Sequence, residues 1–144
     1  MLSRQAICEL MPHAGSMCLI DELLEWSSET IRCRSLSHLS PSNPLRSENG
    51  LNAIHAFEYA AQAIGLHGGL LAQSAGQSPA SGMLVSLRQA TLHRRYLDDT
   101  EAALTVSAQR LLADSRNLLY AFELNLGHET VAAGRAAIIT QQEL

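Results

Sequence analysis

The chain has 144 residues, of which 47% are hydrophobic and 17% are charged, and its formal net charge is −4. These values describe a globular chain rather than a disordered one. The negative balance argues against general nucleic-acid binding, which needs a basic footprint. A chain of this length fits one domain, 1–144, and buries about 68–70% of the surface that its unfolded form exposes.

The cysteines and the start of the chain bear on the cellular compartment. Cys8, Cys18 and Cys33 are odd in number and have no C-x-x-C spacing, which fits a reducing cytosol better than a disulfide framework or a zinc site. No secretory signal is visible at the start, and no apolar stretch approaches the ~20 residues of a membrane span. We therefore expect a cytoplasmic domain with no metal, no cofactor and no membrane span.

The first part of the chain is predicted to hold short elements. We expect a helix at 3–10, strands at 17–26 and 29–37, and a loop at 40–50. Ser3 is a suitable N-cap for the helix, and the alternation of apolar and polar residues is clearest in the second strand. The acidic run 21–25 also allows a helical second half of the first strand.

The second part is predicted to be one long helix followed by strands. The helix covers roughly 51–73, is apolar almost all round and spans about 30 Å. Four strands separated by turn residues follow, at 83–96, 101–111, 117–126 and 130–140. Because strands joined by short turns pair antiparallel, we predict an α+β fold in which one antiparallel sheet wraps around the long helix.

Three stretches resemble the hot-dog fold and, more narrowly, the 3-hydroxyacyl-acyl-carrier-protein dehydratases. Residues 10–21 are similar to the family's leucine-proline-histidine stretch, which leads into an apolar strand ending in aspartate. The segments 43–45 and 57–63 are similar to the family's pre-helix loop and its glutamate-x-x-alanine-glutamine helix, and 88–97 is similar to the strand after that helix. The chain is most similar to a dehydratase-like subgroup linked to aryl-polyene pigment synthesis.

The resemblance implies a lyase that removes water from a 3-hydroxyacyl thioester to give the 2-enoyl thioester, in fatty-acid or polyene-type biosynthesis. The implied substrate carrier is acyl carrier protein or CoA. The chain departs from the family in one respect, because Pro44 stands where fatty-acid dehydratases have a catalytic histidine, and 44–54 holds no histidine. Members of the subgroup can act beside a second hot-dog subunit, so we expect a homodimer, or a heterodimer with a related chain. The alternatives are a hot-dog acyl thioesterase and a non-catalytic acyl-binding subunit that supports a related dehydratase.

The expected catalytic residues are Glu58, His13 and His55. Dehydration needs a base, an acid and donors to the thioester oxygen. A carboxylate such as Glu58 in an apolar helix is rarely there for packing alone, although a structural ion pair with a sheet arginine is the alternative. His13 and His55 are the candidates to replace the missing histidine. The alternative for His13 is a structural role in which its ring fixes the turn, and the alternative for His55 is a solvent-exposed position on the helix. For His67 we expect a cation near the end of the helix.

Three further residues are expected to bind substrate. Gln62, one turn after Glu58, can orient the carboxylate or bind the acyl chain. Arg46 can polarise the thioester or bind the phosphate of a phosphopantetheine group, with a solvated loop arginine as the alternative. Asn52 begins the helix, where the backbone amides of 52–54 can serve the thioester oxygen.

A basic cluster is the expected docking site for the carrier protein. Arg88, Arg94 and Arg95, with His93, form a basic edge in an otherwise acidic chain. Acyl carrier proteins are strongly acidic, so this edge would attract them. A charged strand edge that prevents aggregation is the rival interpretation.

Overall fold

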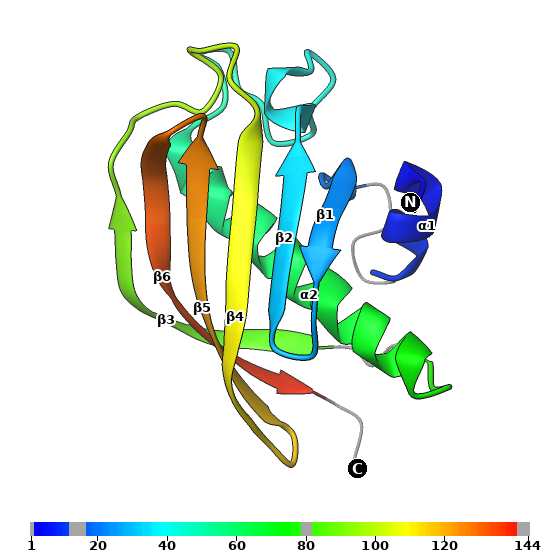
Figure 1. Cartoon of the computed structure of the whole chain (residues 1–144). Helices are drawn as coiled ribbons and strands as arrows, with labels where there is room; N and C mark the ends of the chain where they lie inside the picture. The colour runs from blue at the N-terminus through cyan, green and yellow to red at the C-terminus, as the bar shows by residue number, and fades with distance from the viewer. Residues whose placement is uncertain (1, 12–16, 79–81, 141–144) are drawn as a thin grey trace.

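An antiparallel sheet of six strands curves around one long helix, α2 (Ala56–Ser74), in the computed structural model (Figure 1). The structure describes residues 2–11, 17–78 and 82–140. The other elements are α1 (Arg4–Glu9), β1 (Glu22–Trp26), β2 (Thr30–Ser35), β3 (Gly82–Leu92), β4 (Leu104–Asp114), β5 (Asn117–Leu126) and β6 (Glu129–Thr140). This arrangement confirms the predicted α+β hot-dog fold.

The order of the strands in the sheet is β1-β2-β4-β5-β6-β3. All five neighbouring pairs are antiparallel. β4, β5 and β6 follow one another through short turns, whereas β3, which comes directly after α2, pairs with β6 and forms one edge of the described sheet. The opposite edge is β1, beside which α1 lies (Figure 1).

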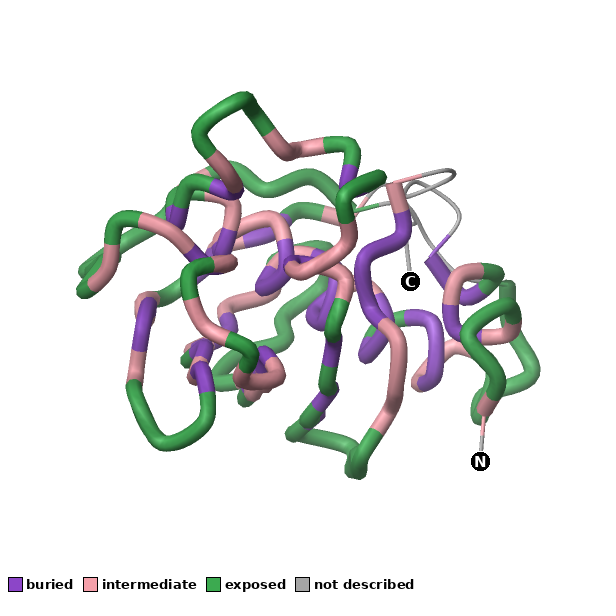
Figure 2. Tube along the Cα trace, turned by 90° about the horizontal axis from the view of Figure 1, so that it is seen from above, coloured by how far each residue is buried: buried purple, intermediate pink, exposed green. Residues whose placement is uncertain are grey.

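The core lies between α2 and the inner face of the sheet. Figure 2 shows the buried residues toward the middle of the molecule and the exposed ones along the outer loops. Tyr59 of α2 and Tyr120 of β5 are among the largest fully buried side chains, and most of the remaining core is aliphatic. Gly69 permits the close approach of α1, since a Cβ at this position would collide with the carbonyl oxygen of Leu10. A larger residue at 69 would push the two helices apart.

Most elements lie where the sequence places them, with shifted ends. Ser3 caps α1 and accepts a hydrogen bond from the Ala6 amide at 3.1 Å. The helical alternative for 21–25 is wrong, because Glu22–Trp26 is a strand paired with β2. β3 ends at Leu92 rather than at 96, because the chain then leaves β6 and pairs with the segment before the helix. There the Arg95 carbonyl accepts from the Ala53 amide at 2.9 Å.

The expectation about the cysteines is wrong in one respect, because Cys8 and Cys18 form a disulfide with Cα atoms 5.7 Å apart. The packing of α1 beside the segment before β1 brings them together, which their spacing in the sequence does not indicate. Cys33 is free and fully buried on the inner face of β2. Burial raises the pKa of the Cys33 thiol to about 12, so this thiol is inert at neutral pH.

No helix in the described ranges is long and apolar enough to cross a membrane.

Candidate active site

An apolar groove of about 200 Å³ runs along α2 on the side that faces β3, β5 and β6. Small helix residues leave this space open, and a Cβ added to Gly68 would meet nothing within 4 Å. The sheet side of the groove is formed chiefly by Leu84, Leu87, Leu118, Phe122, Ala136 and Ile138. Its helix side is formed by Phe57, Glu58, Ala60, Ala61, Ile64, Gly65 and Gly68. The groove therefore has the shape and lining of a site for an extended apolar ligand.

Glu58 is the carboxylate that lines this groove. It lies in the first turn of α2 and is half-buried. Its Oε2 accepts a hydrogen bond from Gln62 Nε2 at 3.3 Å. No ion pair of the described residues includes Glu58, so the alternative of a structural ion pair with a sheet arginine has no support here. Among the described residues Gln62 is the hydrogen-bond partner of this carboxylate, which leaves the other oxygen available to a ligand.

Gln62 links Glu58 to the segment that precedes β1. Its side chain is only 1% exposed. Its Oε1 accepts from the Leu19 amide and its Nε2 donates to the Met17 carbonyl, both at 2.7 Å. Both N–H groups of the side-chain amide are thus engaged, one by Met17 and one by Glu58. In this state Gln62 orients Glu58, and it has no free donor for an acyl chain.

The start of the helix carries His55 and Asn52. His55 occupies the N-cap position of α2, one turn before Glu58, and is half-buried. A short 3-10 turn, Ala53–His55, precedes the helix, and the Asn52 Oδ1 accepts from the Ile54 amide at 2.9 Å to cap this turn. The Ala53 amide donates to Arg95. Two of the amides expected to serve a thioester oxygen are therefore already engaged.

Arg46 is held inside the loop before the helix. Its Nη1 lies 2.6 Å from Asp98 Oδ2, and its other nitrogens donate to the carbonyls of Ser40 at 3.1 Å and His38 at 3.0 Å. Burial acts to raise the pKa of Asp98, but the Leu51 amide and the Arg46 guanidinium outweigh it, so this pKa lies below its ordinary value. In this structure Arg46 therefore anchors the loop to the connection between β3 and β4.

Two other histidines were considered in the sequence, His13 and His67. His13 lies outside the described residues. The expectation for His67 is wrong, since α2 continues to Ser74 and the His67 side chain is fully buried. Its Nε2 lies 2.8 Å from the Ser27 carbonyl, to which it must donate, so Nδ1 accepts from the Tyr120 hydroxyl at 2.5 Å. Burial lowers the pKa of His67, which is consistent with a neutral core residue.

The basic cluster separates into bound and free arginines. Arg94 forms ion pairs with Asp99 and, at 2.7 Å, with Glu129. Arg88 stands directly opposite Arg135 on β6, and in the described part of the chain neither has an acidic partner within ion-pair distance. Arg95 is exposed, and its carbonyl binds the turn at the start of the helix. Within the described ranges, Arg88 and Arg95 are thus the two arginines of the cluster that are free to meet an acidic surface.

Sequence reasoning missed a buried polar network behind the helix. The Tyr59 hydroxyl lies 2.7 Å from Ser37 Oγ and accepts from Asn43 Nδ2 at 3.2 Å. Ser35 Oγ donates to the Leu19 carbonyl at 2.6 Å. The buried serine on the inner face of β2 was visible in the alternation of 29–37, but its partners come from distant parts of the chain. This network fixes the loop before the helix and the segment that Gln62 binds.

The curved sheet, the central helix and the groove lined by a helix carboxylate define a protein of the hot-dog class. The family model for ApeP-like proteins, described as ApeP dehydratase, matches residues 5–144. The chain therefore belongs to this dehydratase family. No curated protein matches the sequence.

Solved structures agree with this fold. The dehydratase heterocomplex ApeI:P from Xenorhabdus doucetiae is similar with a TM-score of 0.85 and 21% identity, over 94% of this chain and 91% of that chain. A thioesterase enzyme from Staphylococcus aureus has a TM-score of 0.65 and 8% identity, over 91% and 99%. A hypothetical thioesterase with coenzyme A from Streptococcus pneumoniae has a TM-score of 0.59 and 12% identity, over 85% and 86%. At these identities the likeness establishes the hot-dog fold.

Proposed function

We propose that this chain is one subunit of a dehydratase that eliminates water from a 3-hydroxyacyl thioester carried by acyl carrier protein. The observation that carries the proposal is Glu58, oriented by Gln62 at 3.3 Å and lining an apolar groove without a cationic partner among the described residues. Membership of the ApeP dehydratase family supports the reaction class.

The proposed reaction places the acyl chain in the groove and its reacting carbons beside Glu58. The C2–H and C3–O bonds break, the C2–C3 double bond forms, and the proton and the hydroxyl leave together as water. Glu58 carries out one of the proton transfers. A histidine carries out the other, and the candidates in this chain are His13 and His55. Because the loop histidine of fatty-acid dehydratases has no counterpart at Pro44, we infer that a second hot-dog chain completes the site.

The proposed second chain adds to the β3 edge of the sheet. β3 is an edge strand with large exposed apolar side chains, including Met83 at 57% and Val85 at 48% exposure. Soluble proteins usually protect such an edge or pair it with another chain. The similarity to the dehydratase heterocomplex ApeI:P supports a related chain as the partner.

The proposed carrier site is the free part of the basic cluster, Arg95 and Arg88. Arg95 is the better placed of the two, since its backbone contacts the turn just before the helix that bears Glu58. An acidic carrier docked there would present its thioester near the start of α2. The proposal keeps the cytoplasmic location expected from the sequence.

The test is an assay of water loss from a 3-hydroxyacyl carrier substrate, with this chain alone, with a related hot-dog subunit alone and with the two combined. We expect the combined proteins to be the most active. Glu58→Gln should lower the rate by about 10²–10⁴-fold, the usual worth of a positioned proton-transfer group. Glu48→Gln is the matched control, because Glu48 is exposed in the loop before the helix.

Two other outcomes would point to the rival functions. Equal rates for Glu58→Gln and the unaltered chain, both with the partner present, would remove Glu58 from the mechanism and leave a non-catalytic acyl-binding subunit. Release of free thiol from acyl-CoA without enoyl product would instead favour a thioesterase. The groove and the helix carboxylate suit that reaction as well, with Glu58 activating water.

A further inference from the structure

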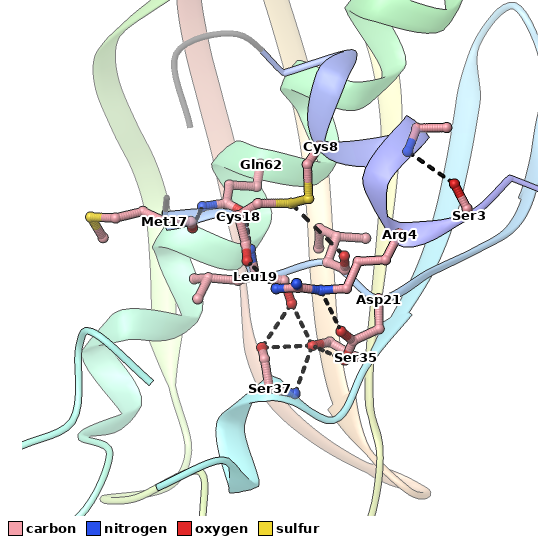
Figure 3. Close-up of a disulfide and its surroundings, with 12 residues drawn as sticks. Ser3, Arg4, Cys8, Met17, Cys18, Leu19, Asp21, Ser35, Ser37 and Gln62 are labelled. Atoms are coloured by element: carbon pink, nitrogen blue, oxygen red, sulfur yellow. Dashed lines mark hydrogen bonds and ion pairs between the residues drawn. A yellow bond between two sulfur atoms is a disulfide. The ribbon is translucent and has the colours of Figure 1, made fainter. Parts of the chain in front are cut away.

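The Cys8–Cys18 disulfide ties α1 to the residues that hold Gln62. Cys18 lies between Met17 and Leu19, and these are the two residues whose backbone groups bind the Gln62 side chain. We call Met17–Leu19 the strap. Figure 3 shows the strap, the disulfide and Gln62 together. A covalent bond to the middle residue of the strap therefore constrains both of the hydrogen bonds that position Gln62.

The strap has further non-covalent supports. The Leu19 carbonyl accepts from Ser35 Oγ at 2.6 Å and from Ser37 Oγ at 2.7 Å. Arg4 Nη2 donates to the Cys18 carbonyl at 2.7 Å, and Arg4 Nε lies 3.0 Å from Asp21 Oδ1. None of these contacts involves a sulfur atom of the disulfide. Loss of the bond is therefore expected to loosen the strap without unfolding the domain.

We propose that reduction and re-formation of the Cys8–Cys18 disulfide regulates the active site, because the bond fixes the strap that positions Gln62 and, through it, Glu58. The inference concerns regulation of the site and rests on the proposed function. Gln62 is a positioning residue in this scheme, since it contacts Glu58 rather than the reacting atoms. The oxidised form is the form in which the strap is fully held.

The reductant is a dithiol, and the half-buried Cys8 is its point of entry, since Cys18 is buried. One thiolate of the dithiol attacks Cys8 Sγ, the Cys8–Cys18 bond breaks, and Cys18 leaves as a thiolate that takes up a proton. The second thiolate of the dithiol then attacks the mixed disulfide and releases Cys8, which is also protonated. The protein gains two electrons and two protons, and the dithiol becomes a disulfide. Re-formation is the reverse exchange, in which the disulfide form of the dithiol is the oxidant and takes back the two electrons and two protons. Cys33 takes no part, because it is fully buried.

The exchange of the Leu19 amide proton tests the proposal directly, because the acceptor of this amide is Gln62. Hydrogen exchange is followed by NMR in the full chain, with and without dithiothreitol. We expect reduction to accelerate exchange at Leu19 by about tenfold or more, as the loop constraint is lost, and to leave the amides of β5 unchanged. In Cys8→Ser the Leu19 amide should exchange as fast as in the reduced protein, with or without dithiothreitol. Cys33→Ala should respond to the reductant as the unaltered chain does.

Dehydration by the chain with its partner subunit is measured on the same samples. We expect several-fold slower turnover after reduction and recovery on reoxidation. Unchanged exchange at Leu19 on reduction would overturn the inference, as would equal acceleration at Leu19 and across β5, which would mean that the bond merely stabilises the whole domain. A third outcome separates the two proposals. If reduction accelerates exchange at Leu19 but the dehydration rate is the same in Glu58→Gln as in the unaltered chain, the redox control of the strap stands and the proposed role of Glu58 is rejected.

Discussion

The two sides of α2 are built in opposite ways. Toward β1 and β2 its polar side chains are buried and satisfied, with Gln62 bound to the strap and Tyr59 bound to Ser37. Toward β3 and β6 it presents Ala61, Gly65 and Gly68, which leave a groove lined by one carboxylate, Glu58. Buried hydrogen bonds specify where the helix lies, and small side chains leave space for a ligand. Stability and ligand binding are therefore assigned to different sides of one helix, which predicts that substitutions on the two sides have different consequences.

Removal of the Gln62 amide should cause the largest loss of stability. Gln62→Leu would leave the Leu19 amide and the Met17 carbonyl without their partner in the interior. At about 1–3 kcal/mol for each of these two unsatisfied groups, we expect the free energy of unfolding to fall by about 2–6 kcal/mol. Urea denaturation measures this change. Glu58→Gln is the control, and an equal loss of stability there would contradict the contrast between the two sides.

Filling the groove should reduce activity without loss of stability. In Gly68→Leu the side chain enters empty space and displaces the acyl chain. Exclusion of about three methylenes, at about 0.8 kcal/mol each, lowers kcat/KM for long-chain substrates by about fiftyfold. The helix itself gains about 0.5–1 kcal/mol from the loss of a glycine. Steady-state kinetics with long and short acyl chains measures the fall in kcat/KM, and thermal unfolding measures the gain in stability. An equal fall in kcat/KM at every chain length would contradict an acyl groove.

Acid should weaken the polar interior before it affects the apolar groove. Burial lowers the pKa of both His38 and His67. The unfolded chain therefore binds protons at a higher pH than the folded chain does, and the stability due to these residues is full above about pH 6.5 and is lost as the pH falls below it. We expect a loss smaller than that of Gln62→Leu. The measurement is the free energy of unfolding between pH 8 and pH 5, and His67→Gln should flatten the slope.

The smallest effect is expected at the surface. Arg95→Glu should raise KM for a carrier-bound substrate a few-fold, consistent with about 0.2–1 kcal/mol for an exposed charge pair, and the effect should vanish in high salt. Arg94→Glu should act through stability instead, because Arg94 is already paired with Asp99 and Glu129. Equal KM effects of the two substitutions would contradict the separation of bound from free arginines.

The sequence predicts those features that depend on local pattern. The apolar helix, the alternating strands and the Ser3 cap follow from periodicity and capping chemistry, and Asn117–Leu126 forms the strand that was expected. The placement of Glu58 beside Gln62 follows from their helical spacing.

Features that depend on contacts between distant segments were not predictable in the same way. The disulfide joins a helix to an extended segment, His67 is buried because Tyr120 and Ser27 approach it from the sheet, and Arg46 is held by Asp98. Each depends on a partner far along the chain, which no local pattern specifies. The local sequence around Arg46 and His67 therefore allows a solvent-exposed position for each, whereas in the structure tertiary hydrogen bonds hold both side chains in place.

The position of β3 has a consequence for the order of events during synthesis. β3 is made directly after α2, yet its neighbour in the described sheet is β6, the last of the six strands. A ribosome adding about 5–20 residues/s needs several seconds to make the strands in between. During that interval β3 has no partner within its own chain, and it joins the sheet only when β6 has emerged. A chain that stops short of β6 would thus display an unpaired apolar strand, which is the kind of surface that chaperones and proteases recognise.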